Sequence, residues 1–407
     1  MSPHKLVKPG EKKTPLKDLS HSNHIPPSVK ENVLKVLDAG SLYRYDVADG
    51  KTSEVSLLEK EFAYYVKAKY AIAVSSCSAA MYMALKCANV QPNDKVLMPA
   101  FTFTAVPSAI VHANAIPVLV EITEDYVIDI DDLRKKIHPD TKVLLLSHMR
   151  GHVGDMDKIV EICKENNVFL IEDAAHSLGV LWNGKQTGTI GKVGCYSLQD
   201  YKIIKSGEGG MFVTDDDVVA AKAIIYAGSY ETYWSTHLLK PEIMEEYQKI
   251  IPTFNFRMSN VTAAIVRPQL AFIDERIKQH NQIYFNLVHI LSKSKYIKLP
   301  KHDSRVSKVF DSIQFRLLGF KTQEIELFET LCNQEGLPIQ LLGGKKFNAR
   351  CFWNWHYFKN IYECPRTREI LNSSFDMRLP LSMKKEDIEN VGNTVTGIID
   401  HICAQNK

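Results

Sequence analysis

Side chains that could do chemistry follow directly after several short apolar runs of this sequence. Lys202 comes soon after VGCYSL, Asp173 closes VFLIED and precedes His176, and Ser76 and Ser78 come after AIAV. A turn of serines that opens a helix offers backbone N–H groups to an anion such as a phosphate. A desolvated lysine amine has a lowered pKa, which suits Schiff-base chemistry, and a buried carboxylate needs a compensating partner.

Each of these residues also has a plain structural explanation. Ser76 and Ser78 could simply cap a helix, and Asp173 could cap the segment that follows it. Lys205 lies three residues after Lys202 and just before the glycine-rich GEGG, so position alone does not separate the two lysines. The sequence contains neither GxGxxG nor GxxxxGK[ST], which argues against a dinucleotide or a nucleoside triphosphate as the source of a bound phosphate.

The elements that must position these residues alternate between strand-like and helix-like patterns from about Val29 onward. Apolar runs such as KVLMPA, IPVLVEI and KVLLLSH are separated by segments with apolar residues three and four apart, such as DMDKIVEICKENN. Strands joined by crossover helices form a largely parallel sheet covered on both faces, and its ligands bind beyond the carboxyl ends of the strands. The run GMFVTDD (210–216) follows a glycine turn and is expected to pair in the opposite direction.

The chain has 407 residues, more than one hydrophobic core usually holds, so two domains are expected. Residues 1–28 are polar and proline-rich, which predicts a flexible arm without a secretory signal. Residues 29–275 form the predicted large α/β domain and residues 276–407 a smaller α+β domain. An amphipathic stretch interrupted at Pro268 lies where the pattern changes.

The composition excludes several classes of function. Lysine and arginine number 50 against 47 acidic residues, so neither a nucleic-acid nor a membrane surface is expected. Eight scattered cysteines without CxxC spacing are typical of reduced thiols in a cytoplasmic protein. His148 and His152 flank a strand end and a glycine instead of sharing a helix face, so no metal site is expected.

Several longer motifs occur in a fixed order. The lysine region reads EDAAH, then G-x-x-G-x-x-G-C-Y-S, then a lysine five residues after that serine, then GEGG. Upstream stand SCSAAM, PAFTFTA and HMRGHVGDM, and downstream stand NFRMSNVTAAI and RLPLSMKKEDIENV. Over roughly residues 30–400 this combination resembles the DegT/DnrJ/EryC1/StrS family of PLP-dependent sugar aminotransferases.

The resemblance implies the type I aminotransferase fold, with a large, mostly parallel α/β/α domain and a smaller C-terminal α+β domain. It implies transfer of an amino group from an amino acid donor, with glutamate expected, to a keto or aldehyde sugar by a ping-pong mechanism through PMP. Lys202 would join pyridoxal 5'-phosphate (PLP) through a Schiff base and move protons. Asp173 would hold the pyridine nitrogen, Phe103 would stack on the ring, and His176 would lie near the phenolic oxygen.

The family also implies ligands for the cofactor's phosphate. Ser78 and Ser197 would bind it, together with backbone N–H groups near Cys77 and Ser78. Cys77 stands where the family usually has glycine, so this turn is expected to differ slightly. Asn255 would reach the phosphate of the neighbouring subunit, because the family builds each site from two chains of a homodimer.

The clearest departure from the family is the segment 40–62, where the family often has a short glycine-proline turn. Here a longer loop carries Arg44 and Tyr45. A subset of the family that aminates a keto-octulosonate resembles this chain at the RY pair. Arg44 could bind a carboxylate through its planar fork, so both residues are substrate candidates and an acidic substrate is indicated.

Other interpretations stay open. PMP-dependent dehydratases in the family have histidine in place of the lysine, and Lys202 argues against that reaction. A PLP enzyme acting on a non-sugar amino compound and a non-catalytic PLP-binding protein remain alternatives. The run FWNWHYF (352–358) could stack on a sugar or could form core or interface of the small domain.

Overall fold

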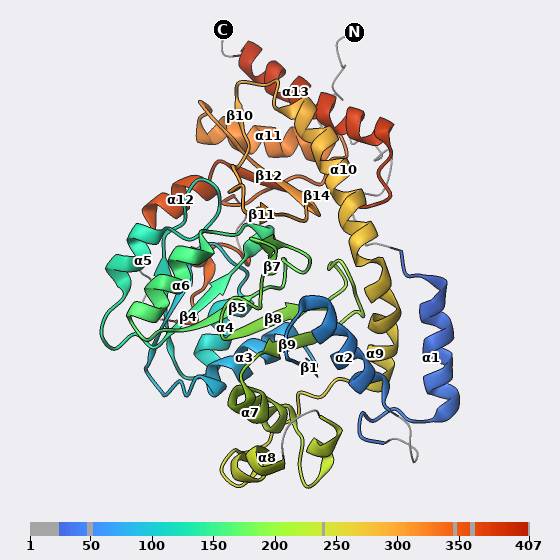
Figure 1. Ribbon diagram of the computed structural model, residues 1–407. Helices are drawn as coiled ribbons and strands as arrows, with labels where there is room; N and C mark the ends of the chain where they lie inside the picture. Colours follow the sequence, from blue (N-terminus) through green and yellow to red (C-terminus); the bar gives the residue numbers. More distant parts are fainter. Residues whose placement is uncertain (1–23, 47–51, 238–240, 345–347, 359–362, 406–407) are drawn as a thin grey trace.

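The computed structural model describes residues 24–46, 52–237, 241–344, 348–358 and 363–405. Its centre is a seven-stranded sheet with the strand order β1-β9-β8-β5-β4-β2-β3 (Figure 1). The strands are β1 (Tyr70–Val74), β2 (Lys95–Pro99), β3 (Ile116–Val120), β4 (Val143–Ser147), β5 (Phe169–Asp173), β8 (Val193–Ser197) and β9 (Gly210–Thr214). β9 is antiparallel to both neighbours, whereas the pairs from β8 to β3 are parallel. The mostly parallel sheet and the reversed strand at 210–214 are confirmed.

Helices cover both faces of this sheet, which is why its strands are apolar on both sides. One layer consists of α3 (Cys77–Cys87), α4 (Ala105–His112) and α7 (Asp217–Ala227). The other consists of α2 (Glu54–Val66), α5 (Ile130–Lys136), α6 (Met156–Glu165) and α9 (Asn260–Val266). Two further helices complete the periphery: α1 (Pro27–Ala39) lies on α9, and α8 (Pro241–Gln248) lies on α7.

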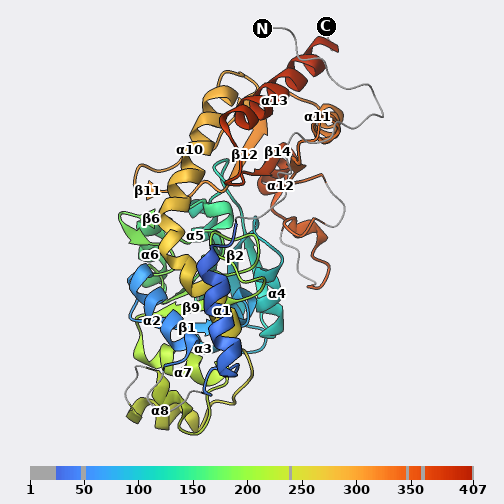
Figure 2. The same ribbon diagram turned by 90° about the vertical axis from the view of Figure 1, so that its right-hand side faces the viewer.

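A second, antiparallel sheet has the order β10-β12-β14-β13. Its strands are β10 (Ile297–Lys298), β12 (Ser312–Leu317), β13 (Gln340–Leu341) and β14 (Ser374–Arg378). A separate core joins it to α10 (Ile273–Leu291), α11 (Thr322–Gln334) and α13 (Lys385–Gln405). Figures 1 and 2 show this layer above the large sheet, with α10 running between the two.

The break at Pro268 has a direct structural counterpart. A 3₁₀ segment, η3 (Arg267–Phe272), separates α9 from α10, with Pro268 in its first turn. Proline has no N–H for a helical hydrogen bond, so the helix is interrupted there. After the break, the first turn of α10 packs in the large-sheet core and its last turns pack in the small-sheet core.

Packing of the C-terminal part does not follow chain order. Phe352, Trp355 and Phe358, in and after η4 (Phe352–Asn354), join the core formed by α3, α4 and α7. The run 352–358 is therefore core of the large domain, although it lies beyond the predicted boundary at residue 276. α12 (Pro365–Leu371) then leads into β14.

A three-stranded sheet also joins the two parts of the chain. It consists of β11 (Val306–Ser307), β6 (Leu181–Trp182) and β7 (Lys185–Gln186).

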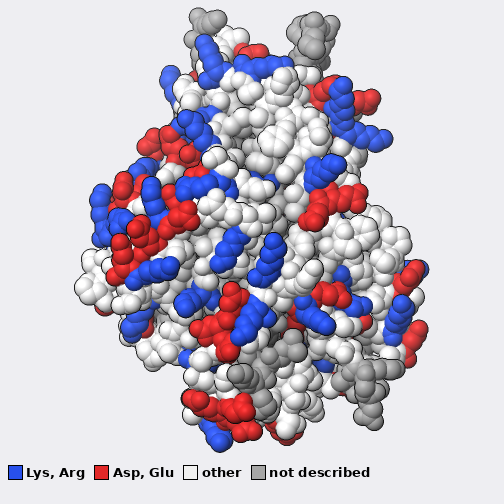
Figure 3. Space-filling model, viewed as in Figure 1, with Lys and Arg blue, Asp and Glu red and all other residues white. Residues whose placement is uncertain are grey.

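The described residues on the side of the molecule shown in Figure 3 carry charges of both signs. Lysine and arginine side chains are interspersed there with aspartate and glutamate. Across the described ranges, no helix is both long and apolar enough to cross a membrane.

The glycine motif before Lys202 forms a closely packed turn. Gly188 has φ +91°, in the left-handed region, and Gly194 in β8 lies against its carbonyl group. A methyl group added at Gly194 would overlap that backbone carbonyl, which cannot move as a side chain can. Only glycine allows β8 to start this close to the turn.

We expect Gly194→Ala to destabilise the protein, because the added methyl group forces the 188–194 backbone apart. Overpacking of this kind costs about 1–3 kcal/mol. The midpoint of urea unfolding, followed by circular dichroism, should fall clearly below that of the wild type. Gly154→Ala is the control, since its nearest neighbouring atoms would be 3.5 Å or more away. Equal midpoints for the two variants would contradict the close packing.

Candidate active site

The carboxyl ends of β1, β2, β4, β5 and β8 share one edge of the large sheet, and a cavity of about 590 Å³ lies beyond it. The small-sheet side closes the cavity with Arg350 and Arg378. Most candidates from the sequence line this cavity: Cys77, Ser78, Phe103, Asp173, His176, Ser197 and Lys202. The crossover connections of a parallel sheet thus bring distant segments of the chain to one place.

Asp173 lies at the end of β5 with its carboxylate held by neutral donors. The Ser147 hydroxyl donates to Oδ2 at 2.7 Å, and the Ala175 N–H donates to Oδ1 at 3.1 Å. The Cys77 thiol lies 3.8 Å from Oδ1, and burial raises the pKa of that thiol well above its usual value. Within the described residues, no lysine or arginine forms an ion pair with Asp173. A buried carboxylate with neutral donors alone is suited to a cationic ligand group.

Lys202 faces the cavity beside His176, with 3.1 Å between Nζ and Nε2. Burial lowers the pKa of the Lys202 amine to about 8, and the positive charges of Arg378 and Arg150 act in the same direction. Burial, followed by the charge of Lys202, also holds the pKa of His176 well below its usual value. The pair therefore combines a readily deprotonated amine with a neutral imidazole.

The structure separates the two lysines that the sequence could not. Lys205 does not line the cavity, and its amine lies 3.5 Å from a carboxylate oxygen of Asp200. Its backbone carbonyl accepts a hydrogen bond from Gln269 at 2.7 Å. Lys202 is the lysine that reaches the same space as Asp173.

The N-terminus of α3 also lines the cavity. Ser76 caps α3 by accepting the Ala79 N–H at 3.0 Å, while the N–H groups of Cys77 and Ser78 lie in the first turn, where the helix offers no carbonyl. Gly210 packs so closely that a Cβ there would overlap the Cys77 nitrogen. Glycine at this point therefore lets β9 begin directly beside the helix end.

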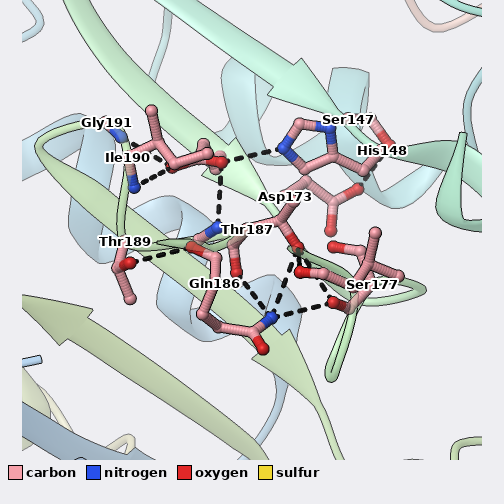
Figure 4. Close-up of polar contacts among 12 residues, drawn as sticks. Ser147, His148, Asp173, Ser177, Gln186, Thr187, Thr189, Ile190 and Gly191 are labelled. Atoms are coloured by element: carbon pink, nitrogen blue, oxygen red, sulfur yellow. Dashed lines mark hydrogen bonds and ion pairs between the residues drawn. The ribbon is translucent and has the colours of Figure 1, made fainter. Parts of the chain in front are cut away.

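A second buried carboxylate, Glu172 in β5, holds the turn that precedes β8. Glu172 pairs with His148 at 2.9 Å and accepts three backbone N–H groups of the turn 188–191 at 2.6–2.8 Å. Burial acts to raise the pKa of Glu172, but His148 and these donors outweigh it, so the pKa is lowered. Figure 4 shows His148 and Asp173 beside this turn. Glu172 thereby fixes the loop that leads into β8.

Three predicted residues lie outside the cavity. Arg44 is only 2% exposed and makes two hydrogen bonds to Glu59, at 2.8 and 3.0 Å. Tyr45 lies 3.1 Å from Nε2 of His237 and is also buried. Neither residue lines the cavity of its own chain, and the Nε of Arg44 has no hydrogen-bond partner within the described residues. Asn255 is exposed and does not contact the cavity of its own chain.

Sequence reasoning missed three arginines that line the cavity: Arg150, Arg350 and Arg378. Arg150 follows the carboxyl end of β4, so the rule that located Asp173 and Lys202 could have found it. Arg350 and Arg378 come from the C-terminal part, where no comparable rule relates sequence position to the cavity.

The donor set fits PLP. Asp173 forms no ion pair with any lysine or arginine that the structure describes, the start of α3 offers N–H groups to a phosphate, and Lys202 has a lowered pKa. Phe103 adds an aromatic side chain that is 47% exposed at the cavity. An acid, an amine, an anion site and an aromatic face are the groups that this cofactor requires of a protein.

Comparisons with known proteins agree with this assignment. The GDP-perosamine synthase of Vibrio cholerae is 33% identical over 236 residues, which cover 56% of this chain and 60% of that protein. The 3-amino-5-hydroxybenzoate synthase of Amycolatopsis mediterranei is 28% identical over 327 residues, 80% of this chain and 81% of that one. The match spans only about three fifths of the perosamine synthases, 60% and 58% for those of Vibrio cholerae and Caulobacter vibrioides.

The fold has close counterparts among solved structures. The crystal structure of 3-amino-5-hydroxybenzoic acid synthase matches with a TM-score of 0.82 at 23% identity, over 96% of this chain and all of that one. The type I aminotransferase fold expected from the sequence is confirmed. The sequence pattern of one family matches residues 29–396. The chain belongs to the DegT/DnrJ/EryC1/StrS aminotransferase family, whose members depend on PLP.

Proposed function

We propose that this protein is an aminotransferase that moves an amino group from an amino acid, with glutamate as the expected donor, to a keto or aldehyde sugar. The observation that carries the proposal is the desolvated Lys202 amine facing the same cavity as Asp173, which forms no ion pair within the described residues. Relatives named as perosamine synthases support a sugar as the acceptor.

Different cavity residues would bind different parts of PLP. Asp173 would hold the pyridine nitrogen, kept in place by Ser147. Ser78 and Ser197 would bind the phosphate, and Phe103 would cover the ring. When bound, PLP supplies a ring that accepts electrons from a bond to the substrate carbon.

Proton movement falls to Lys202. With a pKa of about 8, a useful fraction of its amine is neutral near physiological pH and can take a proton from a substrate carbon. His176 accepts a hydrogen bond from the protonated amine at Nε2, 3.1 Å away, and so keeps the amine aimed into the cavity. Because donor and acceptor use one cavity, they bind in turn, which is a ping-pong scheme. Lys202 also argues against the dehydratase reaction.

We further propose that the protein acts as a homodimer in the cytoplasm. All eight cysteines are free thiols and seven are buried, which suits a reducing compartment. Asn255 is exposed and outside its own cavity, as a residue that serves a neighbouring subunit would be.

Replacing Lys202 with methionine should abolish transamination. The wild type should absorb visible light with PLP bound, and glutamate should bleach this absorption as PMP forms. In Lys202→Met we expect bleaching to slow at least about 1,000-fold, since a positioned acid–base group contributes this much. Lys205→Met is the matched control and should bleach like the wild type. If no amino donor changes the wild-type spectrum, the protein is a non-catalytic PLP binder.

The pKa of Lys202 can be measured without the cofactor. Only a neutral amine reacts with acetic anhydride, and a lowered pKa means that the neutral form already prevails above about pH 8. In the cofactor-free protein, mass spectrometry should show Lys202 acetylation rising with a midpoint near pH 8. In urea the same lysine should return toward its ordinary value of 10.5. A folded-state midpoint near 10.5 would refute desolvation of this amine.

The shared site can be tested by mixing two inactive variants. If Asn255 acts on the neighbour's site, a dimer of one Lys202→Met chain and one Asn255→Asp chain has one intact site and one doubly altered site. After random exchange of subunits, roughly a quarter of the sites should be intact, and activity should return to that level. No recovery despite exchange, shown by native mass spectrometry, would place Asn255 outside the partner's site.

A further inference from the structure

Three arginines from distant segments converge on the side of the cavity that faces the small sheet. Arg150 lies in η1 (Met149–Gly151) just after β4, Arg350 precedes η4, and Arg378 ends β14. Their charges all act on His176, which shows that they surround the same space as the Lys202–His176 pair. In the scheme above none of them holds the cofactor or moves a proton, although the charges of Arg378 and Arg150 help to lower the pKa of Lys202.

Protein carboxylates compensate this positive charge only in part. Asp376 accepts hydrogen bonds from Arg150 and from Gln314, and its Oδ2 lies 3.3 Å from Nη1 of Arg350. Arg378 is attracted by the partly buried Asp311 and donates to the Tyr201 carbonyl at 3.0 Å. These three guanidinium groups thus share the buried Asp376 and the partly buried Asp311. Glu208 also lines the cavity, but it is exposed to solvent.

Arg150 carries the decisive observation. The residue is 2% exposed, and only Nη2 has a partner, Asp376. Its Nε and Nη1 have no hydrogen-bond partner within the described residues, although the side chain lines the cavity. The backbone at Arg150 has φ 55° and ψ 25°, a left-handed conformation that costs energy in a non-glycine residue and is concentrated at functional sites.

Unpaired guanidinium N–H groups in a buried position are costly, and each of them can donate a charge-assisted hydrogen bond to a carboxylate oxygen. A donor amino acid brings carboxylates that can pair with them. When the acceptor replaces the donor in the same cavity, a neutral sugar offers these groups only hydroxyl and carbonyl oxygens, which bind a guanidinium more weakly than a carboxylate does. An acceptor with its own carboxylate offers them the stronger partner.

We propose that Arg150, Arg350 and Arg378 form a carboxylate site and that the amino acceptor is a keto or aldehyde sugar acid. This proposal rests on the aminotransferase function proposed above and names its substrate class. The acidic substrate that the Arg44–Tyr45 pair indicated is assigned to different residues, because Arg44 is bound to Glu59.

The test uses ligands that bind without reacting. The protein is loaded with PMP and titrated by calorimetry with D-gluconate and with D-glucitol, which lack a carbonyl and differ in one carboxylate. We expect gluconate to bind at least about tenfold more tightly than glucitol, the effect of one charge-assisted hydrogen-bonded pair. Arg150→Gln should reduce this preference to less than about threefold. Arg378→Lys, which keeps the charge, should retain part of it.

Arg134→Gln is the matched control, because Arg134 lies on the surface of α5 and pairs there with Glu165. It should keep the full preference. Equal binding of gluconate and glucitol, absence of binding by both, or tighter binding of glucitol 6-phosphate than of gluconate would overturn the proposal. So would a preference that survives both Arg150→Gln and Arg378→Gln.

Two further measurements distinguish failure of the carboxylate-site proposal from failure of the proposed aminotransferase function. Bleaching of the PLP form by glutamate, measured on the same preparation, reports on the aminotransferase function alone. If Arg150→Gln weakens glutamate while the PMP form does not discriminate gluconate from glucitol, the arginines serve the donor only and the acceptor claim fails.

Discussion

The arrangement of the site depends on how two adjacent buried carboxylates at the end of β5 are compensated. Successive side chains of a strand point to opposite faces, so Glu172 and Asp173 must be compensated in different places. Glu172 is 0% exposed and is satisfied from within the protein, by His148 and the turn 188–191. Asp173 has only neutral donors and faces the cavity. The Glu172 carboxylate therefore stabilises the protein, whereas the Asp173 carboxylate faces the space that a ligand could occupy.

The Glu172 interaction also determines where Lys202 can lie. By holding the turn 188–191, it fixes the start of β8, and the close contact of Gly194 with Gly188 leaves no freedom of register there. Lys202 follows a few residues after β8. The distance between the Asp173 carboxylate and the Lys202 amine thus depends on the packing of a turn that does not itself line the cavity.

Much of this arrangement could be predicted from the sequence, because it follows from local rules. Apolar runs with crossover helices predict a parallel sheet, and the residues after each run therefore meet at one edge. That rule located Asp173, Ser78 and Lys202. The choice of Lys202 over Lys205 depends on which way each side chain turns after the strand, and the family motif supplied that answer before the geometry did.

Other features could not be predicted, for reasons that are equally physical. Arg44 resembles a substrate ligand in sequence, and its pairing with Glu59 depends on how α2 packs beside the preceding loop. The core position of Phe352 and Trp355 depends on a C-terminal segment returning to the large sheet. Contacts of this kind join segments far apart in the chain, and no local pattern encodes them.

This division explains why the sequence indicates the reaction more clearly than the substrate. The groups that would hold PLP come from one edge of one sheet, so their spacing forms a recognisable motif. The arginines come from η1, from the stretch before η4 and from the end of β14, and Asp376 on the small sheet links Arg150 to Arg350. In the proposed scheme, substrate selection therefore depends on how the two sheets are packed together, whereas the residues of the same chain that would hold PLP belong to the large-sheet part. A change in that packing could alter the acceptor without disturbing Lys202 or Asp173.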